Sequence, residues 1–166
     1  MRKIIGILGL ILIMVGCKVN YSFTGASISP DIKTITIKNF PNYAALAQPS
    51  ISQKFTESLR DVFTTQTNLT FVNSGGDVQL EGSVNNFITN PVAVQGNQIA
   101  ASNRLSITVH VKFINTKDEK QNFETDFTRY ADFPSNQNLA TVEEQLIKEI
   151  NTQISQDIFN RAFTNW

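Results

Sequence analysis

Alternation of apolar and polar residues predicts four strands. Apolar side chains recur at about every second position in the segments 33–40, 78–88, 105–113 and 123–129. A period of two is typical of a strand with one buried face and one polar face. In the second segment the face expected to be buried carries Val78, Leu80, Gly82, Val84 and Ile88.

A period close to 3.6 residues predicts two helices. In the segment 49–65 one stripe holds Ile51, Phe55, Leu59, Val62 and Phe63, and Pro49 suits a first helical turn. A longer stripe runs from 139 to 163 and contains Val142, Leu146, Ile150, Ile154, Ile158 and Ala162. Thr141 and Glu144 fit a capping box at its start.

The order of these elements is strand, helix, three strands, helix. It predicts an α+β fold: a single small mixed sheet of about four strands with two helices packed on one face. The segment 115–122 reads as a hairpin connection, which places Lys112 near Glu124 or Asp126 on the polar face. The polar segment Thr89 to Asn103 is expected to be a loop.

The N-terminus has the pattern of a bacterial lipoprotein signal. Arg2 and Lys3 precede an apolar run from Ile4 to Val15, which is too short to span a bilayer. The run ends at Cys17, the only cysteine, in a sequence that resembles a lipobox. We therefore expect a signal peptide at 1–16, lipidation of Cys17, an acylated tether at 17–32 and a single domain at 33–166. Two or three acyl chains suffice to hold a protein on a membrane.

Charge and cysteine content narrow the class of protein. The chain carries 14 Lys plus Arg and 14 Asp plus Glu, and loss of Arg2 and Lys3 with the signal leaves a formal charge of −2. Nucleic-acid-binding proteins are usually strongly basic, so this balance argues against a nucleic-acid partner. With its one cysteine lipidated the domain has no disulfide, so a hydrophobic core must hold it together.

Candidate catalytic chemistry is sparse. His110 is the only histidine, and it lies on the polar face of a predicted strand. A zinc site, a Cys/His pair or a Ser/His/Asp triad would each need it, yet no second cysteine or sequence cluster of carboxylates accompanies it. Gly75, Gly76 and Gly96 lack the spacing of a phosphate loop. We expect no enzyme activity, no metal and no cofactor.

Several segments together resemble one family. They are Tyr21 to Ile28, Lys33 to Ile35, Phe40 to Asn42, Leu59 to Phe63, Asn103 to Val109 and Arg129 to Phe133. In this order, and behind the lipobox, they are similar to the LptE family of lipopolysaccharide-assembly lipoproteins in the form found in Bacteroidetes. The resemblance extends over essentially the whole mature chain.

This resemblance implies a non-enzymatic component of the machine that delivers lipopolysaccharide to the outer leaflet. Members sit as a plug inside the LptD barrel, assist its assembly and can bind lipopolysaccharide. We expect a lipid-anchored outer-membrane protein that faces the periplasm, with an LptD-like barrel and lipopolysaccharide as partners. The alternative is a free periplasm-facing lipoprotein that binds a glycan or lipid in a pocket shaped by the 89–103 loop.

Arg104 and Lys112 are the candidate lipopolysaccharide contacts. Lipid A and its inner core carry anionic groups, which arginine and lysine hold through charge-assisted hydrogen bonds. Arg104 closes the 89–103 loop at the start of the longest predicted strand, Lys112 lies on the polar face of that strand, and the two are expected to form one patch. The competing interpretation is that Arg104 bonds loop carbonyls and that Lys112 pairs with Glu124 or Asp126.

Overall fold

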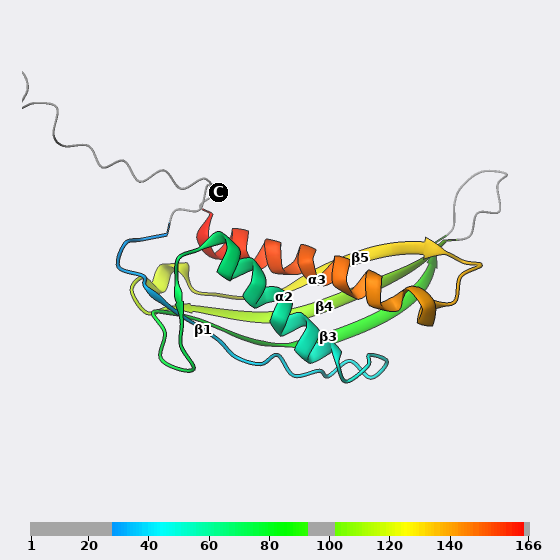
Figure 1. Ribbon diagram of the computed structural model, residues 1–166, viewed down its shortest axis with the longest axis horizontal. Helices are drawn as coiled ribbons and strands as arrows, with labels where there is room; N and C mark the ends of the chain where they lie inside the picture. Colours follow the sequence, from blue (N-terminus) through cyan, green and yellow to red (C-terminus); the bar gives the residue numbers. More distant parts are fainter. Residues whose placement is uncertain (1–27, 93–101, 165–166) are drawn as a thin grey trace, which may run out of the picture.

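The computed structural model describes residues 28–92 and 102–164. They form two layers, a sheet and a pair of helices (Figure 1). The elements in chain order are β1 (Thr34–Ile37), α2 (Ile51–Gln66), β2 (Thr70–Phe71), β3 (Val78–Val92), β4 (Ser102–Asn115), a 3₁₀ turn η2 (Glu119–Gln121), β5 (Phe123–Pro134) and α3 (Leu139–Phe163). The α+β fold expected from the sequence is confirmed.

The sheet has five strands in the order β2-β1-β3-β4-β5, one more than expected. The extra strand is β2, whose two residues pair in parallel with Thr34 and Ile35 of β1. It is too short to show an alternation in the sequence. β1 also pairs in parallel with β3, whereas β3, β4 and β5 are antiparallel, so the sheet is mixed as predicted.

A β-bulge at Asn85 corrects the predicted facing of β3. Val84 pairs with Val109, but the next pairs are Asn86 with Thr108 and Phe87 with Ile107. The inserted residue shifts the alternation by one position, because two residues of the bulged strand oppose one on its partner. Phe87 therefore enters the core, and Ile88, expected to be buried, is 37% exposed on the opposite face.

The strands are longer than predicted at the end of the sheet where the 89–103 loop was expected. β3 continues to Val92, β4 begins at Ser102 and β5 continues to Pro134. The ladder holds these polar residues in strand conformation through backbone hydrogen bonds, a contribution that side-chain alternation does not reveal. Only residues 93–101 of the expected loop lie outside these strands, and they are also outside the described residues.

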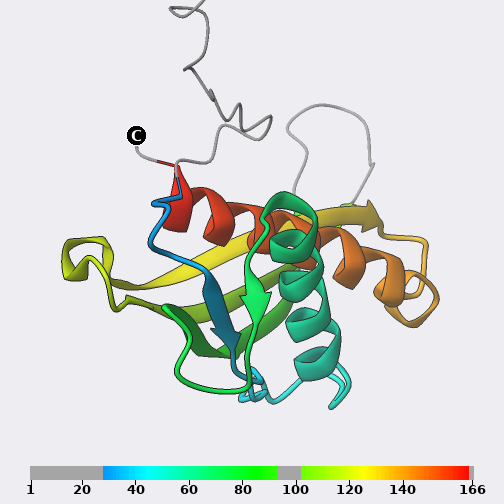
Figure 2. The ribbon, with the colours of Figure 1, turned by 60° about the vertical axis from the view of Figure 1, so that its left-hand side comes forward.

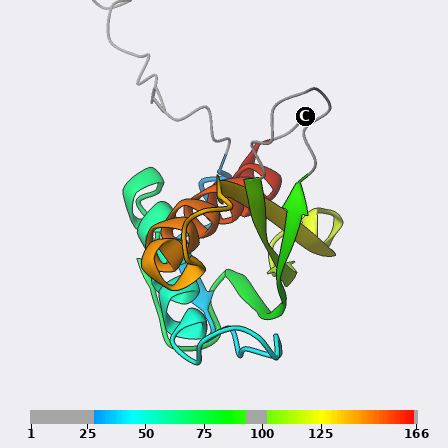
Figure 3. The ribbon, with the colours of Figure 1, turned by 90° about the vertical axis from the view of Figure 1, so that its right-hand side faces the viewer.

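Both helices cover the same face of the sheet (Figures 2 and 3). α3 has the predicted bounds, and α2 begins two residues later than predicted. Their apolar stripes meet the buried side chains of the strands in one continuous core, which also includes Ile32. The α3 N-cap is Asn138, whose side chain accepts from the Ala140 N–H, so the capping box expected at Thr141 and Glu144 is wrong.

Asp77 ties the start of β3 to β1. Its carboxylate accepts hydrogen bonds from the N–H groups of Lys33 and Thr34, at 3.0 Å each, and from the Thr34 hydroxyl at 2.8 Å. The Lys33 N–H and then the Lys117 ammonium are the main groups that hold the pKa of Asp77 far below its ordinary value. This strongly shifted carboxylate thus has a structural role.

Candidate functional site

The sheet face opposite the helices, here called the open face, carries a ladder of polar side chains from β3, β4 and β5. β4 contributes every second residue from Arg104 to Lys112, since Leu105, Ile107, Val109, Val111 and Phe113 point into the core. The cross-strand registers place five rows side by side on this face: Glu81, Lys112 and Glu124; Ser83, His110 and Asp126; Asn86, Thr108 and Thr128; Ile88, Ser106 and Tyr130; Asn90, Arg104 and Asp132.

Glu81 links two lysines at one end of the open face. Its carboxylate lies 2.6 Å from the Lys38 ammonium and 3.5 Å from that of Lys112. The hydrogen bond from Lys38 is the main reason that the pKa of Glu81 is lowered. Lys112 therefore pairs with Glu81 on β3. The competing interpretation, which paired it with Glu124 or Asp126 on β5, is wrong about the partner. At 3.5 Å this contact is the longer of the two, and the lysine stays 45% exposed.

His110 bridges two carboxylates of β5, Asp126 in its own row and Glu124 in the neighbouring row. Nδ1 is 2.7 Å from Asp126 and Nε2 is 3.1 Å from Glu124. Asp126 and then Glu124 favour the imidazolium and raise the pKa of His110 above its ordinary value. Both ring nitrogens thus face carboxylates in a surface network that favours the protonated form of His110. Among the described residues, no group of three or more His, Cys, Asp or Glu side chains is arranged so that it could hold a metal ion.

His110 makes a pH-dependent contribution to stability. A raised pKa in the folded protein means that the contribution is fully present below the unfolded-state pKa of about 6.5 and is lost as pH rises through the raised value. We expect His110→Asn to lower the free energy of unfolding more at about pH 6 than at about pH 9, measured by urea denaturation. An equal effect at both pH values would contradict this linkage.

Arg104 lies at the opposite end of the open face. It forms a two-pronged ion pair with Asp132, Nε to Oδ1 at 2.7 Å and Nη2 to Oδ2 at 2.9 Å. Its guanidinium also stacks 3.6 Å from the ring centroid of Tyr130. The pair raises the pKa of Arg104 and lowers that of Asp132. Arg104 therefore pairs with a carboxylate on β5, whereas the competing interpretation assigned it to carbonyls of a loop whose residues 93–101 lie outside the described residues.

The structure does not bring the two candidate lipopolysaccharide contacts together. Arg104 and Lys112 share one face of β4, but they lie eight positions apart along the strand, about 26 Å at 3.3 Å per residue. They do not form one patch. The open face, with the neighbouring Lys38, carries as many acidic side chains as basic ones when His110 is counted as basic, so its net charge is close to zero. The acidic residues are Glu81, Glu124, Asp126 and Asp132, and the basic ones are Lys38, Arg104, Lys112 and His110. The lipidation candidate Cys17 lies outside the described residues.

Two tyrosines on the open face were missed by the sequence analysis. Tyr130 is 50% exposed beside Ser106, and Tyr43 is 72% exposed and lines a shallow hollow of about 440 Å³. The hollow is also lined by Lys38, His110 and Lys112. Tyr130 continues the polar alternation of β5, so extending that strand beyond Arg129 would have revealed its position. Tyr43 lies in the connection between β1 and α2, where the apolar residues show neither helical nor strand periodicity.

Residues 32–162 match the family model described as "LptE: Lipopolysaccharide-assembly". Comparison with curated proteins finds no match.

Solved structures with the same fold include a minor lipoprotein from Acinetobacter baumannii, at 13% identity over 78% of this chain and 91% of that one, with a TM-score of 0.53. Lipoprotein B from Nitrosomonas europaea matches at 16% identity, 87% and 88% coverage and a TM-score of 0.54. Rare lipoprotein B from Shewanella oneidensis matches at 14% identity over 77% of this chain and 92% of that one, with a TM-score of 0.53. Because the family model covers most of the chain and its described fold, the chain belongs to the LptE lipopolysaccharide-assembly family.

Proposed function

We propose that this protein is the lipoprotein component of the outer-membrane lipopolysaccharide export machine, that it plugs an LptD-like barrel and helps to assemble it, and that it binds lipopolysaccharide. It has no enzyme activity in this role. Acyl chains on Cys17 anchor it to the outer membrane, facing the periplasm. The observation that carries the proposal is the family match over residues 32–162.

The open face supports a role inside a hydrated lumen. Its charges are already paired within the sheet, and hydroxyls such as those of Thr108 and Thr128, 2.9 Å apart, satisfy one another. Such a surface stays in contact with water or with polar barrel walls without burying an unpaired charge. Within residues 28–92 and 102–164 no helix has the length and apolar character to cross a membrane.

Affinity purification of the lipidated protein from detergent-solubilised outer membranes tests the proposal. A large barrel protein recovered in equal amount is the expected result. Recovery of the lipoprotein without a barrel would contradict the plug role and would favour the alternative, a free binding module for a glycan or lipid. A soluble form that begins after Cys17 serves as a control for detergent-driven association.

Replacing Cys17 with serine is expected to move the protein from the outer membrane to the soluble periplasmic fraction. The hydroxyl cannot take the thioether-linked lipid, and each buried methylene of an acyl chain contributes about 0.8 kcal/mol to membrane binding. The domain itself should keep its melting temperature. Fractionation in cells that lack the barrel checks the result, and variant protein that stays on membranes after carbonate and salt washing would refute lipidation.

Arg104 and Lys112 remain our candidates for lipopolysaccharide contact, now as two separate points. Lys112 is held only by the long contact to Glu81, which leaves its ammonium available to an anionic group. Arg104 uses Nε and Nη2 for Asp132, so a ligand phosphate would have to bind its remaining donors. The near-neutral surroundings favour weak individual contacts over one strong anion site.

The double variant Arg104→Gln, Lys112→Gln is expected to bind lipopolysaccharide about tenfold more weakly. Two weak contacts of about 0.7 kcal/mol each, within the range of a typical net hydrogen bond, sum to the roughly 1.4 kcal/mol that corresponds to a factor of ten. Neutral substitutions avoid placing new carboxylates beside Asp132 and Glu81. Binding is measured with purified lipopolysaccharide and protein of unchanged melting temperature. Lys120→Gln, in the exposed β4–β5 connection, is the control. Equal affinity for the double variant and this control would place the contact elsewhere.

A further inference from the structure

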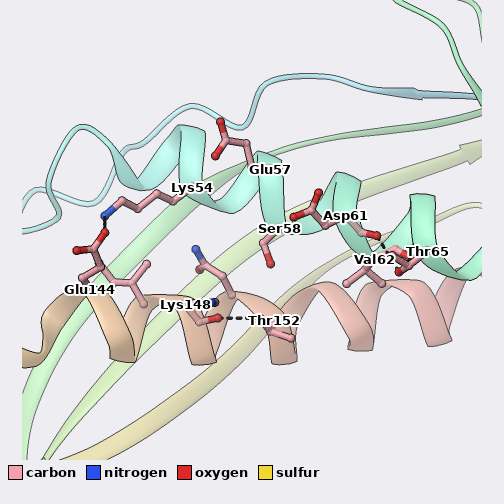
Figure 4. Close-up of a pocket in the computed structure, with 11 residues that line it drawn as sticks. Lys54, Glu57, Ser58, Asp61, Val62, Thr65, Glu144, Lys148 and Thr152 are labelled. Carbon is pink, nitrogen blue, oxygen red and sulfur yellow. Dashed lines mark hydrogen bonds and ion pairs between the residues drawn. The ribbon is translucent and has the colours of Figure 1, made fainter.

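A groove separates α2 from α3 on the outer side of the helix layer (Figure 4). It has a volume of about 460 Å³, within the range of small-molecule sites. Ser58 and Val62 of α2 and Lys148 of α3 border it, and Ile147 and Asn151 add an apolar and a polar group from α3. Nothing in the proposed plug role uses this groove, and it lies on the layer opposite the open face.

Asn151 is the unusual residue of the groove. It is 1% exposed, and neither Nδ2 nor Oδ1 has a hydrogen-bond partner. It is the only buried side chain in the described residues with unsatisfied polar atoms, whereas its buried neighbour Ser155 bonds the Ser58 hydroxyl at 3.3 Å. A carboxamide offers a donor and an acceptor side by side, so the complementary group is another amide.

Side-chain bridges join α2 to α3 at one end of the groove and beyond the other. The Lys54 ammonium lies 3.0 Å from Glu144, and Gln66 and Gln156 exchange hydrogen bonds of 2.5 and 3.2 Å. Twelve helical residues separate Lys54 from Gln66, a length of about 18 Å. A compact ligand fits between the bridges, and an extended tripeptide, at about 3.3 Å per residue, spans roughly 10 Å.

Apart from the Lys54–Glu144 bridge, the rims carry opposite charges that no ion pair among the described residues neutralises, although Glu57 accepts a 2.8 Å hydrogen bond from Gln53 Nε2. Glu57 and Asp61, one turn apart on α2, form no ion pair within the described residues, and neither does Lys148 on α3. An ammonium group is complementary to the first rim and a carboxylate to the second. A free peptide carries both of these termini, amide groups between them, and side chains that pack on Val62 and Ile147.

We propose that the groove between α2 and α3 binds a short free peptide. A peptide amide bonds the Asn151 carboxamide, the peptide's amino terminus lies at the Glu57 and Asp61 rim, and its carboxylate pairs with Lys148. Because Asn151 is covered in the empty groove, the rim opens on binding. The exposed Lys148 side chain can move aside, since no ion pair with a described residue holds it.

Titration of the mature protein with the tripeptide Ala-Leu-Ala tests this inference by two-dimensional NMR. We expect the side-chain amide signals of Asn151 to shift in a saturable manner. Asn151→Leu removes the unsatisfied amide without enlarging the side chain much, so the variant should fold, and it should bind at least about tenfold more weakly. Gln145→Leu, an exposed change elsewhere on α3, is the matched control and should bind normally.

Peptides with blocked termini test whether the charged ends of the peptide contribute to binding. Lys148→Glu should weaken binding of the free peptide more than binding of its C-terminally amidated form. If the doubly capped peptide binds as well as the free one, the occupant is an internal protein segment and the free-peptide assignment is wrong. Unmoved Asn151 signals, equal binding by Asn151→Leu, or a resident water that persists at Asn151 in excess peptide would each overturn the site. None of these outcomes depends on the barrel.

Discussion

Replacing Ile150 with aspartate is expected to unfold the domain. Ile150 is fully buried on α3, and Leu59 on α2 is equally inaccessible. Either aspartate would bring an uncompensated carboxylate into an apolar core, at a cost of several kcal/mol against a total stability of about 5–15 kcal/mol. Chemical denaturation of purified protein, or steady-state level in the periplasm where purification fails, measures the loss.

The exposed position Gln145 on the same helix supplies the control. Gln145→Asp changes charge and helix propensity in a similar way but buries nothing, so its effect should be within about 0.5 kcal/mol. If Ile150→Asp and Leu59→Asp both accumulated normally and melted like this control, the helical stripes would not form the core and the two-layer arrangement would be wrong.

Gly82→Ala is expected to have the second largest effect. A Cβ at this position would lie 2.0 Å from the backbone carbonyl oxygen of His110 on β4 and 2.7 Å from the Phe40 ring. The carbonyl belongs to the central strand pair and cannot retreat without disturbing the ladder. We therefore expect destabilisation at or above the upper end of the roughly 1–3 kcal/mol that overpacking costs.

Ser83→Ala is the matched control, because Ser83 is the next residue of β3 and its hydroxyl bonds only the side chain of Asn85. Urea denaturation of the two variants should separate them clearly. Similar midpoints would mean that β3 and β4 adjust to the added methyl group, and that the close approach at Gly82 is not needed for the fold.

Sequence periodicity predicted the elements whose buried side chains recur at regular intervals along the chain. α3 presents an apolar stripe along its whole length, from Val142 to Ala162, so its bounds follow from the sequence alone. β4 alternates without a break because its helix-side residues are all buried. The capping box failed because Asn138, just ahead of the stripe, satisfies the first free N–H group before Thr141 is reached.

The features that failed depend on partners distant in sequence. The bulge at Asn85 exists only in relation to β4, and without that register Ile88 continues the alternation of Val78 to Val84. In the same way, Lys112 has candidate partners on both neighbouring strands, and local spacing could not choose Glu81 over Glu124. The unsatisfied Asn151 was invisible because polar residues at a helix interface look like an ordinary interruption of an apolar stripe.

The two edges of the sheet differ in a way that bears on solubility. β2 closes one edge with two residues, whereas β5 offers twelve at the other, and no described strand pairs with its outer side. A long unpaired edge is a template for self-association. Glu124, Asp126, Arg129 and Asp132 place charged side chains along it, and charged residues on an edge strand disfavour pairing with a second copy. The charged edge therefore helps to keep the protein from polymerising before it meets a partner.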